Sequence, residues 1–87
     1  MPIPTKYGWT LTIDIHGMRA REAEDCVLRT VAQGMRDKDI REVTVVHGYH
    51  GGRALLEMVR ALRSPAVLRR EMGLNNGQTT LILNKKL

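Results

Sequence analysis

The feature that most constrains this chain is a His-Gly pair that follows each of two separate apolar segments. The first is Ile13-Asp14-Ile15-His16-Gly17 and the second is Thr44-Val45-Val46-His47-Gly48, with a helix-sized segment between them. A strand, a crossover helix and a second parallel strand take about 30 residues, and the crossover is almost always right-handed. Both strands should therefore end at the same edge of a sheet. The two histidines are predicted to lie close together at that edge, where ligands bind in open α/β sheets.

Apolar periodicity along the chain predicts the order βαβαββ. We expect strands at about residues 10–16, 42–46, 67–74 and 79–83, with Asn75-Asn76-Gly77 as a hairpin turn. A first helix is expected at about residues 20–35, and a second is marked by Leu55, Met58, Val59 and Leu62 and ends near Arg63. Leu11, Ile13 and Ile15 alternate with polar residues, so helices should cover only one face of the sheet. The predicted fold is an α/β two-layer sandwich with a four-stranded mixed sheet. Residues 1–8, which contain two prolines, are expected to be a flexible arm before a single domain of residues 9–87.

Composition and charge limit the class of partner. The sequence contains neither an apolar run of about 20 residues nor a signal-peptide core, which predicts a cytoplasmic protein without a membrane partner. The formal net charge is +5, and all of this excess follows Gly48. Such a bias favours a polyanion, DNA or RNA, over the alternative of an ordinary solvated basic face. The candidate phosphate-binding residues are the second motif and its loop with four later cations: Gly48, Tyr49, His50, Gly51, Gly52, Arg53, Arg60, Lys85 and Lys86.

The two motifs also supply candidates for chemistry. Asp14 and His16 lie two residues apart in a strand and should point to the same side, and His47 is expected to approach them from the neighbouring strand. An imidazole can act as a general base near neutral pH, and a carboxylate can orient it or hold a divalent cation such as Mg²⁺. Asp14, His16 and His47 are therefore the predicted catalytic residues, with Asp14 the candidate metal ligand. The alternative is structural: a hydrogen-bonded pair that fixes the strand end, and glycines that form a tight turn.

These motifs carry a family resemblance. Ile13-Asp14-Ile15-His16-Gly17-Met18 resembles the L-D-L-H-G-M signature of the Smr (small MutS-related) domain, and Val45-Val46-His47-Gly48 with Gly51-Gly52 resembles its second, H-G-x-G-x-G type motif. The closing strand, Gly77-Gln78-Thr79, matches the family's G-x-T. The second motif departs from the pattern, because Tyr49 and His50 stand where Lys and Gly are common.

The resemblance implies a fold similar to the C-terminal domain of bacterial translation initiation factor 3. It also implies nucleic-acid binding and, in several members, nicking endonuclease or endoribonuclease activity. From the residues and the resemblance together, we expect a nucleic-acid-binding domain that cleaves phosphodiester bonds in DNA or RNA, with no tightly bound cofactor except Mg²⁺ if a metal is used. The alternatives are a module that binds without cleaving, and a protein-interaction adaptor that uses the polar sheet face. The sequence leaves the oligomeric state open and is compatible with a monomer.

Overall fold

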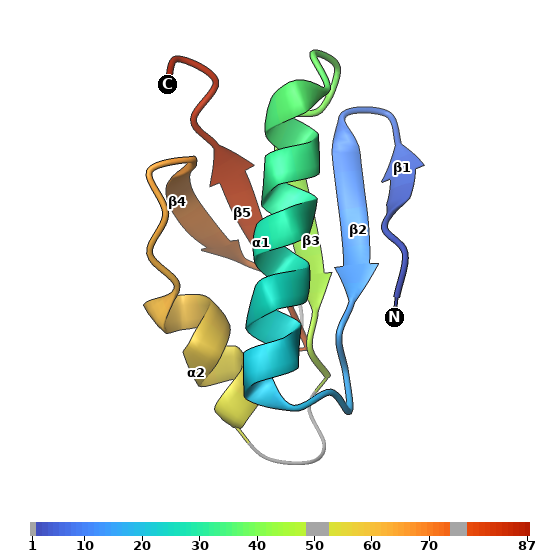
Figure 1. Ribbon diagram of the computed structural model, residues 1–87, viewed down its shortest axis with the longest axis vertical. Coiled ribbons are helices and arrows are strands. Elements are labelled where there is room, and N and C mark those ends of the chain that lie inside the picture. The colour runs from blue at the N-terminus through green and yellow to red at the C-terminus, as the bar shows by residue number, and fades with distance from the viewer. Residues whose placement is uncertain (1, 49–52, 74–76) are drawn as a thin grey trace.

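The fold was analysed in a computed structural model, which describes residues 2–48, 53–73 and 77–87. The elements follow in the order β1 (Thr5–Tyr7), β2 (Thr10–Asp14), α1 (Ala20–Arg36), β3 (Glu42–Val46), α2 (Ala54–Ala61), β4 (Val67–Met72) and β5 (Gln78–Leu83). The described strands form one five-stranded sheet in the order β1-β2-β3-β5-β4 (Figure 1). The parallel pair β2–β3 lies beside antiparallel pairs, so the sheet is mixed.

The expected βαβαββ core is confirmed, and the strand count is the main correction. Residues 5–7 lie in the segment expected to be a flexible arm, but they form β1, which pairs antiparallel with β2 through Thr5↔Thr12 and Tyr7↔Thr10. The turn between the two strands contains Gly8, whose φ of +60° suits glycine. The two prolines just before the strand and this glycine after it are typical of a loop, so the sequence pattern does not reveal the three-residue strand between them.

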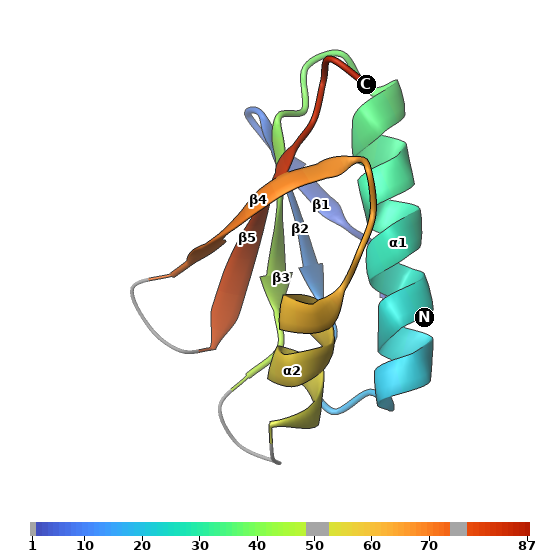
Figure 2. The ribbon, with the colours of Figure 1, turned by 90° about the vertical axis from the view of Figure 1, so that its left-hand side faces the viewer.

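Both helices pack on one face of the sheet, as the alternation in β2 predicts (Figure 2). That face and the helices form the core, which contains Leu11 and Ile13 from β2, Val43 and Val45 from β3, and Leu81 and Leu83 from β5, packed with Ala23, Cys26, Val27 and Val31 from α1 and Val59 from α2. Fourteen buried hydrophobic side chains make up this cluster, and all of them are aliphatic or cysteine. A core without aromatic rings is what a chain lacking phenylalanine can build. Within the described residues, no helix covers the opposite face of the sheet.

The parallel pair fixes where the two His-Gly motifs lie. Asp14 pairs with Val46, and the N–H of Ile15 donates to the carbonyl of Val46 at 2.9 Å, so both strands end at one edge of the sheet. This confirms the prediction from topology. The first strand ends at Asp14, two residues earlier than expected, so His16 lies in the turn that leads to α1.

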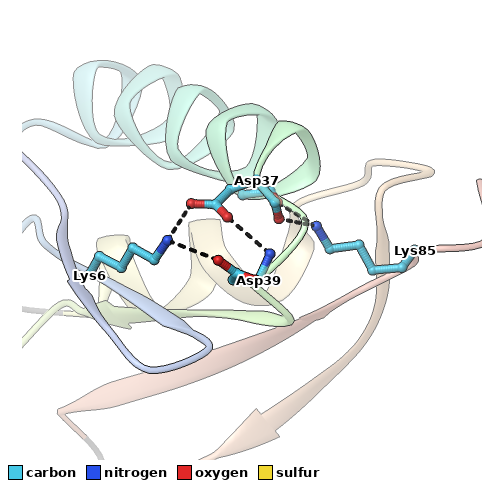
Figure 3. A network of polar contacts seen from close by, with 5 residues as sticks. Lys6, Asp37, Asp39 and Lys85 are labelled. Carbon is cyan, nitrogen blue, oxygen red and sulfur yellow. Dashed lines mark hydrogen bonds and ion pairs between the residues drawn. The ribbon is translucent and has the colours of Figure 1, made fainter.

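At the other end of the sheet, a polar network joins both terminal segments to the C-terminal end of α1 (Figure 3). Lys6 Nζ donates to Asp37 Oδ2 at 2.8 Å and lies 3.7 Å from Asp39 Oδ2. Lys85 Nζ donates to the backbone carbonyl of Gly34, in the last turn of α1, and to that of Asp37, the C-cap residue of the helix. A lysine in this position caps the negative end of the helix dipole.

Candidate active site at the ends of β2 and β3

The centre of the site is a carboxylate–imidazole pair at the end of β2. His16 Nδ1 lies 2.5 Å from Asp14 Oδ1, and the same carboxylate oxygen accepts the backbone N–H of His16 at 3.1 Å. The two bonds from one residue hold the carboxylate in place relative to the imidazole. The Asp14 side chain is 51% exposed and the His16 side chain is 70% exposed, so solvent and a large ligand can reach both. Asp14 and His16 lie together as the sequence predicted, and their hydrogen bonds are also those expected of the structural alternative, a pair that fixes the strand end.

The environment of Asp14 favours its charged form. Burial opposes ionisation, but the hydrogen bonds from the His16 ring and backbone, together with the charge of the imidazole, outweigh it and lower the pKa of Asp14 below its ordinary value. Asp14 is therefore a carboxylate at neutral pH and accepts a proton-bearing Nδ1–H. When the imidazole is neutral, that arrangement leaves the lone pair on Nε2, the ring nitrogen that faces away from the carboxylate.

His47 does not join this pair, which corrects the expectation of two imidazoles in one open site. Its side chain is only 3% exposed and continues the buried face formed by Val43 and Val45. Nε2 lies 3.0 Å from Thr79 Oγ1 and Nδ1 lies 3.3 Å from the carbonyl oxygen of Gly48. With Nδ1–H as donor to the carbonyl and the threonine hydroxyl as donor to Nε2, both nitrogens of a neutral ring are satisfied. The two motifs share a dipeptide, but their histidines differ in exposure because His47 continues the core-facing side of its strand.

The glycines of the two pairs have a common conformational role. Gly17 and Gly48 have φ values of +76° and +80°, in the region that side chains other than glycine rarely adopt. A Cβ atom on Gly48 would lie 3.3 Å from Cβ of His16, so the second motif packs directly against the first. The N–H of Gly48 donates to the carbonyl of Gly77 at 2.9 Å. Phosphate binding at Gly48 stays a prediction, and its backbone amide already has this backbone acceptor.

The four cations among the predicted phosphate-binding residues lie in two different parts of the domain. Arg53 is exposed immediately before α2, and Arg60 is exposed in the last turn of the same helix. Lys85 and Lys86 follow β5 at the end of the sheet far from Asp14, and Lys85 is bound to α1, so the expected patch around the second motif does not include them. Four further predicted residues, Tyr49, His50, Gly51 and Gly52, lie outside the described residues.

The donor set around Asp14 provides little support for a resident metal ion. Among the residues that the structure describes, no group of three or more His, Cys, Asp or Glu side chains is arranged to hold a cation. One oxygen of Asp14 is engaged with both the ring and the backbone N–H of His16. Asp14 stays the predicted ligand for Mg²⁺, and the remaining oxygen ligands of such an ion would come from water or from the substrate.

Thr79 is the residue that the analysis of charge and motifs missed. It is 1% exposed on the core face of β5, and its hydroxyl is the partner of the buried His47 Nε2. The signal was present in the sequence, in the Gly77-Gln78-Thr79 segment of the closing strand. A threonine on the core face of a strand needs a hydrogen-bond partner, and a buried histidine supplies one.

The fold and the site together define a class: a small two-layer α/β domain with a mixed sheet, which presents an Asp-x-His pair and a histidine–glycine turn at the ends of its two parallel strands. The sequence matches the Smr domain family over residues 13–73, and the chain belongs to this family. The match includes both His-Gly motifs and all of β4.

A solved structure supports the fold. The domain is similar to the crystal structure of the Smr domain of Thermus thermophilus MutS2, with a TM-score of 0.75 and 22% sequence identity over 84% of this chain and 96% of that one. No curated protein sequence matches the chain. Within the described residues, neither helix has the length and apolar character needed to cross a membrane.

Proposed function

We propose that this domain binds nucleic acid and cleaves its phosphodiester bonds with the Asp14–His16 pair. The observation that carries the proposal is the geometry of the pair: a 2.5 Å contact between the carboxylate and the imidazole, both open to solvent, on a backbone fixed by a second hydrogen bond. Membership of the Smr domain family, whose members bind or cleave nucleic acids, supports the same function.

In the proposed reaction, His16 is the general base. Its Nε2 takes the proton of a water molecule or of a ribose 2′-hydroxyl as the oxygen attacks phosphorus. The new P–O bond forms while the bond to the leaving oxygen breaks, and the leaving oxygen takes a proton from water. Asp14 holds the ring through Nδ1 and stabilises the imidazolium that forms, and exposed cations such as Arg53 stabilise the charge that develops on the phosphate.

His47 and Gly48 act in this proposal as positioning residues. The buried hydrogen bond from Thr79 fixes the His47 ring, and the positive φ of Gly48 places its backbone against His16. A side chain at Gly48 would fit only if His16 shifted, because its Cβ would lie 3.3 Å from Cβ of His16. The backbone at Gly48 thereby limits where the His16 side chain can lie.

The deciding experiment measures binding and cleavage together. Supercoiled plasmid and RNA should each be incubated with the protein, with and without Mg²⁺, beside the variants Asp14→Asn and His16→Ala. We expect both variants to retain most of the affinity and to lose cleavage, while Asp25→Asn, a matched carboxylate change on the outer face of α1, keeps both. Equal cleavage by wild type and His16→Ala would sink the catalytic proposal and point to a contaminating nuclease.

The same experiment separates the alternatives. Salt-dependent binding without cleavage under any condition would identify a module that only binds DNA or RNA. Absence of binding to either polymer would reject both nucleic-acid functions and leave the adaptor hypothesis, in which a protein docks on the uncovered sheet face.

A further inference from the structure

We infer that a groove between the C-terminal end of α2 and β4 is a second phosphate-binding site for the polynucleotide held at Asp14 and His16. The inference rests on the proposed function and adds a specific contact surface to it. The groove has a volume of about 490 Å³ and is lined by three arginines with small or apolar neighbours: Arg60, Ala61, Leu62, Arg63, Ser64, Pro65, Val67 and Arg70. We call it the arginine groove.

The charges that line the arginine groove are uncompensated. No carboxylate lines it, and none of its arginines forms an ion pair with a carboxylate within residues 2–48, 53–73 and 77–87. Arg70 Nε donates to the carbonyl of Val59 at 3.1 Å, which fixes that guanidinium against α2 and leaves its terminal nitrogens for a ligand. Arg60 Nη2 lies 3.5 Å from Met72 Sδ, a weak acceptor. Three arginines that line one hollow match phosphate oxygens better than any other common ligand.

The other surfaces of the domain are poorer candidates for the path of a polyanion. Register places four charged residues of the strands on the uncovered sheet face, Asp14, Glu42, Arg69 and Glu71, and the one cation is paired with Glu71 at 3.3 Å. A second basic hollow, lined by Arg36, Lys38, Arg41 and Lys85, lies at the end of the sheet opposite to Asp14, and the ammonium group of Lys85 there is already bound to backbone carbonyls. The arginine groove, in contrast, is joined to the second His-Gly motif through Arg53 and α2.

The length of α2 gives the spacing between the two contacts. The helix begins at Ala54, directly after Arg53, and its last turn carries Arg60 at the arginine groove. Eight residues of helix are about 12 Å long. One strand of a duplex advances about 3.4 Å per phosphate along the axis, so this length corresponds to three or four phosphates. A duplex that lies along α2 would contact Arg53 near the reacting phosphate and the arginine groove three or four phosphates away.

The experiment measures how binding depends on salt. Affinity for a 20-base-pair DNA duplex should be followed by fluorescence anisotropy between about 50 and 200 mM KCl. For the double variant Arg60→Gln/Arg63→Gln, we expect the slope of log affinity against log salt to become shallower by about 0.9 per arginine removed. The ratio of the affinity at 50 mM KCl to that at 200 mM KCl should thus fall by about 3.5-fold for each phosphate contact that is lost. Arg29→Gln, on the outer face of α1, removes one arginine elsewhere and should leave the slope unchanged.

Two controls keep the result interpretable. Arg60→Lys/Arg63→Lys preserves the charge and should restore the slope, and a urea unfolding curve shows whether the glutamine variant is folded. An unchanged slope in the folded glutamine variant would overturn the inference, as would an equal reduction in Arg29→Gln, which would mean that only total charge matters.

Failure of the groove and failure of the proposed function have different signatures. If both are right, the glutamine variant raises KM and keeps kcat, whereas Asp14→Asn lowers kcat and keeps the salt slope. If the domain binds without cleaving, the slopes still test the groove. If the wild-type protein binds no nucleic acid, the proposed function and this inference both fail.

Discussion

Replacement of the two motif glycines by alanine separates a backbone effect from a contact effect. Gly17 and Gly48 have nearly the same positive φ, +76° and +80°, but a Cβ on Gly17 would have no neighbour within 4 Å, whereas one on Gly48 would lie 3.3 Å from Cβ of His16. The left-handed conformation costs an L-residue about 1–2 kcal/mol. Gly17→Ala should therefore destabilise the fold by about 1–2 kcal/mol through the backbone alone.

Gly48→Ala should cost more, because 3.3 Å is shorter than the optimal carbon–carbon separation of about 3.5–4.0 Å. Relieving the contact requires a shift of a few tenths of an ångström. Such a small overpacking should lower the free energy of unfolding by a further amount of about 1 kcal/mol, the lower limit of the usual range for overpacked sites. The group that must move is His16, whose Nδ1 contact with Asp14 at 2.5 Å would be disturbed. We expect Gly48→Ala to reduce nucleic-acid cleavage, while Gly17→Ala retains it at a temperature where both variants are folded.

Urea unfolding and the NMR chemical shifts of the His16 ring protons at one fixed pH give the two readouts. The predicted result is a free energy of unfolding lower in Gly48→Ala than in Gly17→Ala, with displaced His16 ring signals only in Gly48→Ala. Equal stabilities and identical His16 ring signals would refute the contact between the motifs as a constraint on His16. An unchanged stability for Gly17→Ala would refute the conformational argument itself.

Three further predictions concern stability. Gly34→Ala should destabilise by about 1–3 kcal/mol in urea unfolding, because the new Cβ would lie 2.9 Å from a methyl carbon of a core leucine. Thr79→Val should cost about 1–3 kcal/mol in the same assay, since buried His47 Nε2 loses its partner, and a neutral result would contradict that hydrogen bond. For the exposed Lys6–Asp37 pair, the hydrogen bond between them lowers the pKa of Asp37 and raises that of Lys6. In pH-dependent thermal unfolding, the stability difference from Lys6→Met should thus be complete between the ordinary pKa values of 3.8 for aspartate and 10.5 for lysine, and should disappear only as the pH falls through the lowered pKa of Asp37 or rises through the raised pKa of Lys6.

Much of the fold follows from the sequence, because it rests on local patterns. The alternation of Leu11, Ile13 and Ile15 sets the buried face of β2, and topology brings its end beside Val46 of β3. The strand β1 was missed because three residues between loop-forming prolines and glycine carry no periodic signal. Its formation depends on hydrogen bonds to β2, a non-local interaction.

The sequence predicts the Asp14–His16 pair of the candidate site, but it does not predict the environment of His47. Asp14 and His16 are close in sequence, so their contact depends on local geometry alone. The environment of His47 depends on Thr79, which is 32 residues away on β5, and no spacing rule reveals such a partner. The net charge of the second half of the chain led to Lys85 being predicted as a phosphate-binding residue. Its ammonium group instead caps a helix, and a formal charge in the sequence does not show this.

The two outer strands of the sheet have consequences for how copies of this domain behave at high concentration. An exposed strand edge offers unpaired backbone groups to any other extended chain. On one side that edge is β1, only three residues long, and on the other it is β4, six residues long with Arg69, Arg70 and Glu71 in its middle. Short length and charge are two means by which sheet proteins avoid joining edge to edge. The arginine that faces the groove on β4 therefore also helps to keep the domain from growing into continuous sheets, and neutralising this strand would favour aggregation.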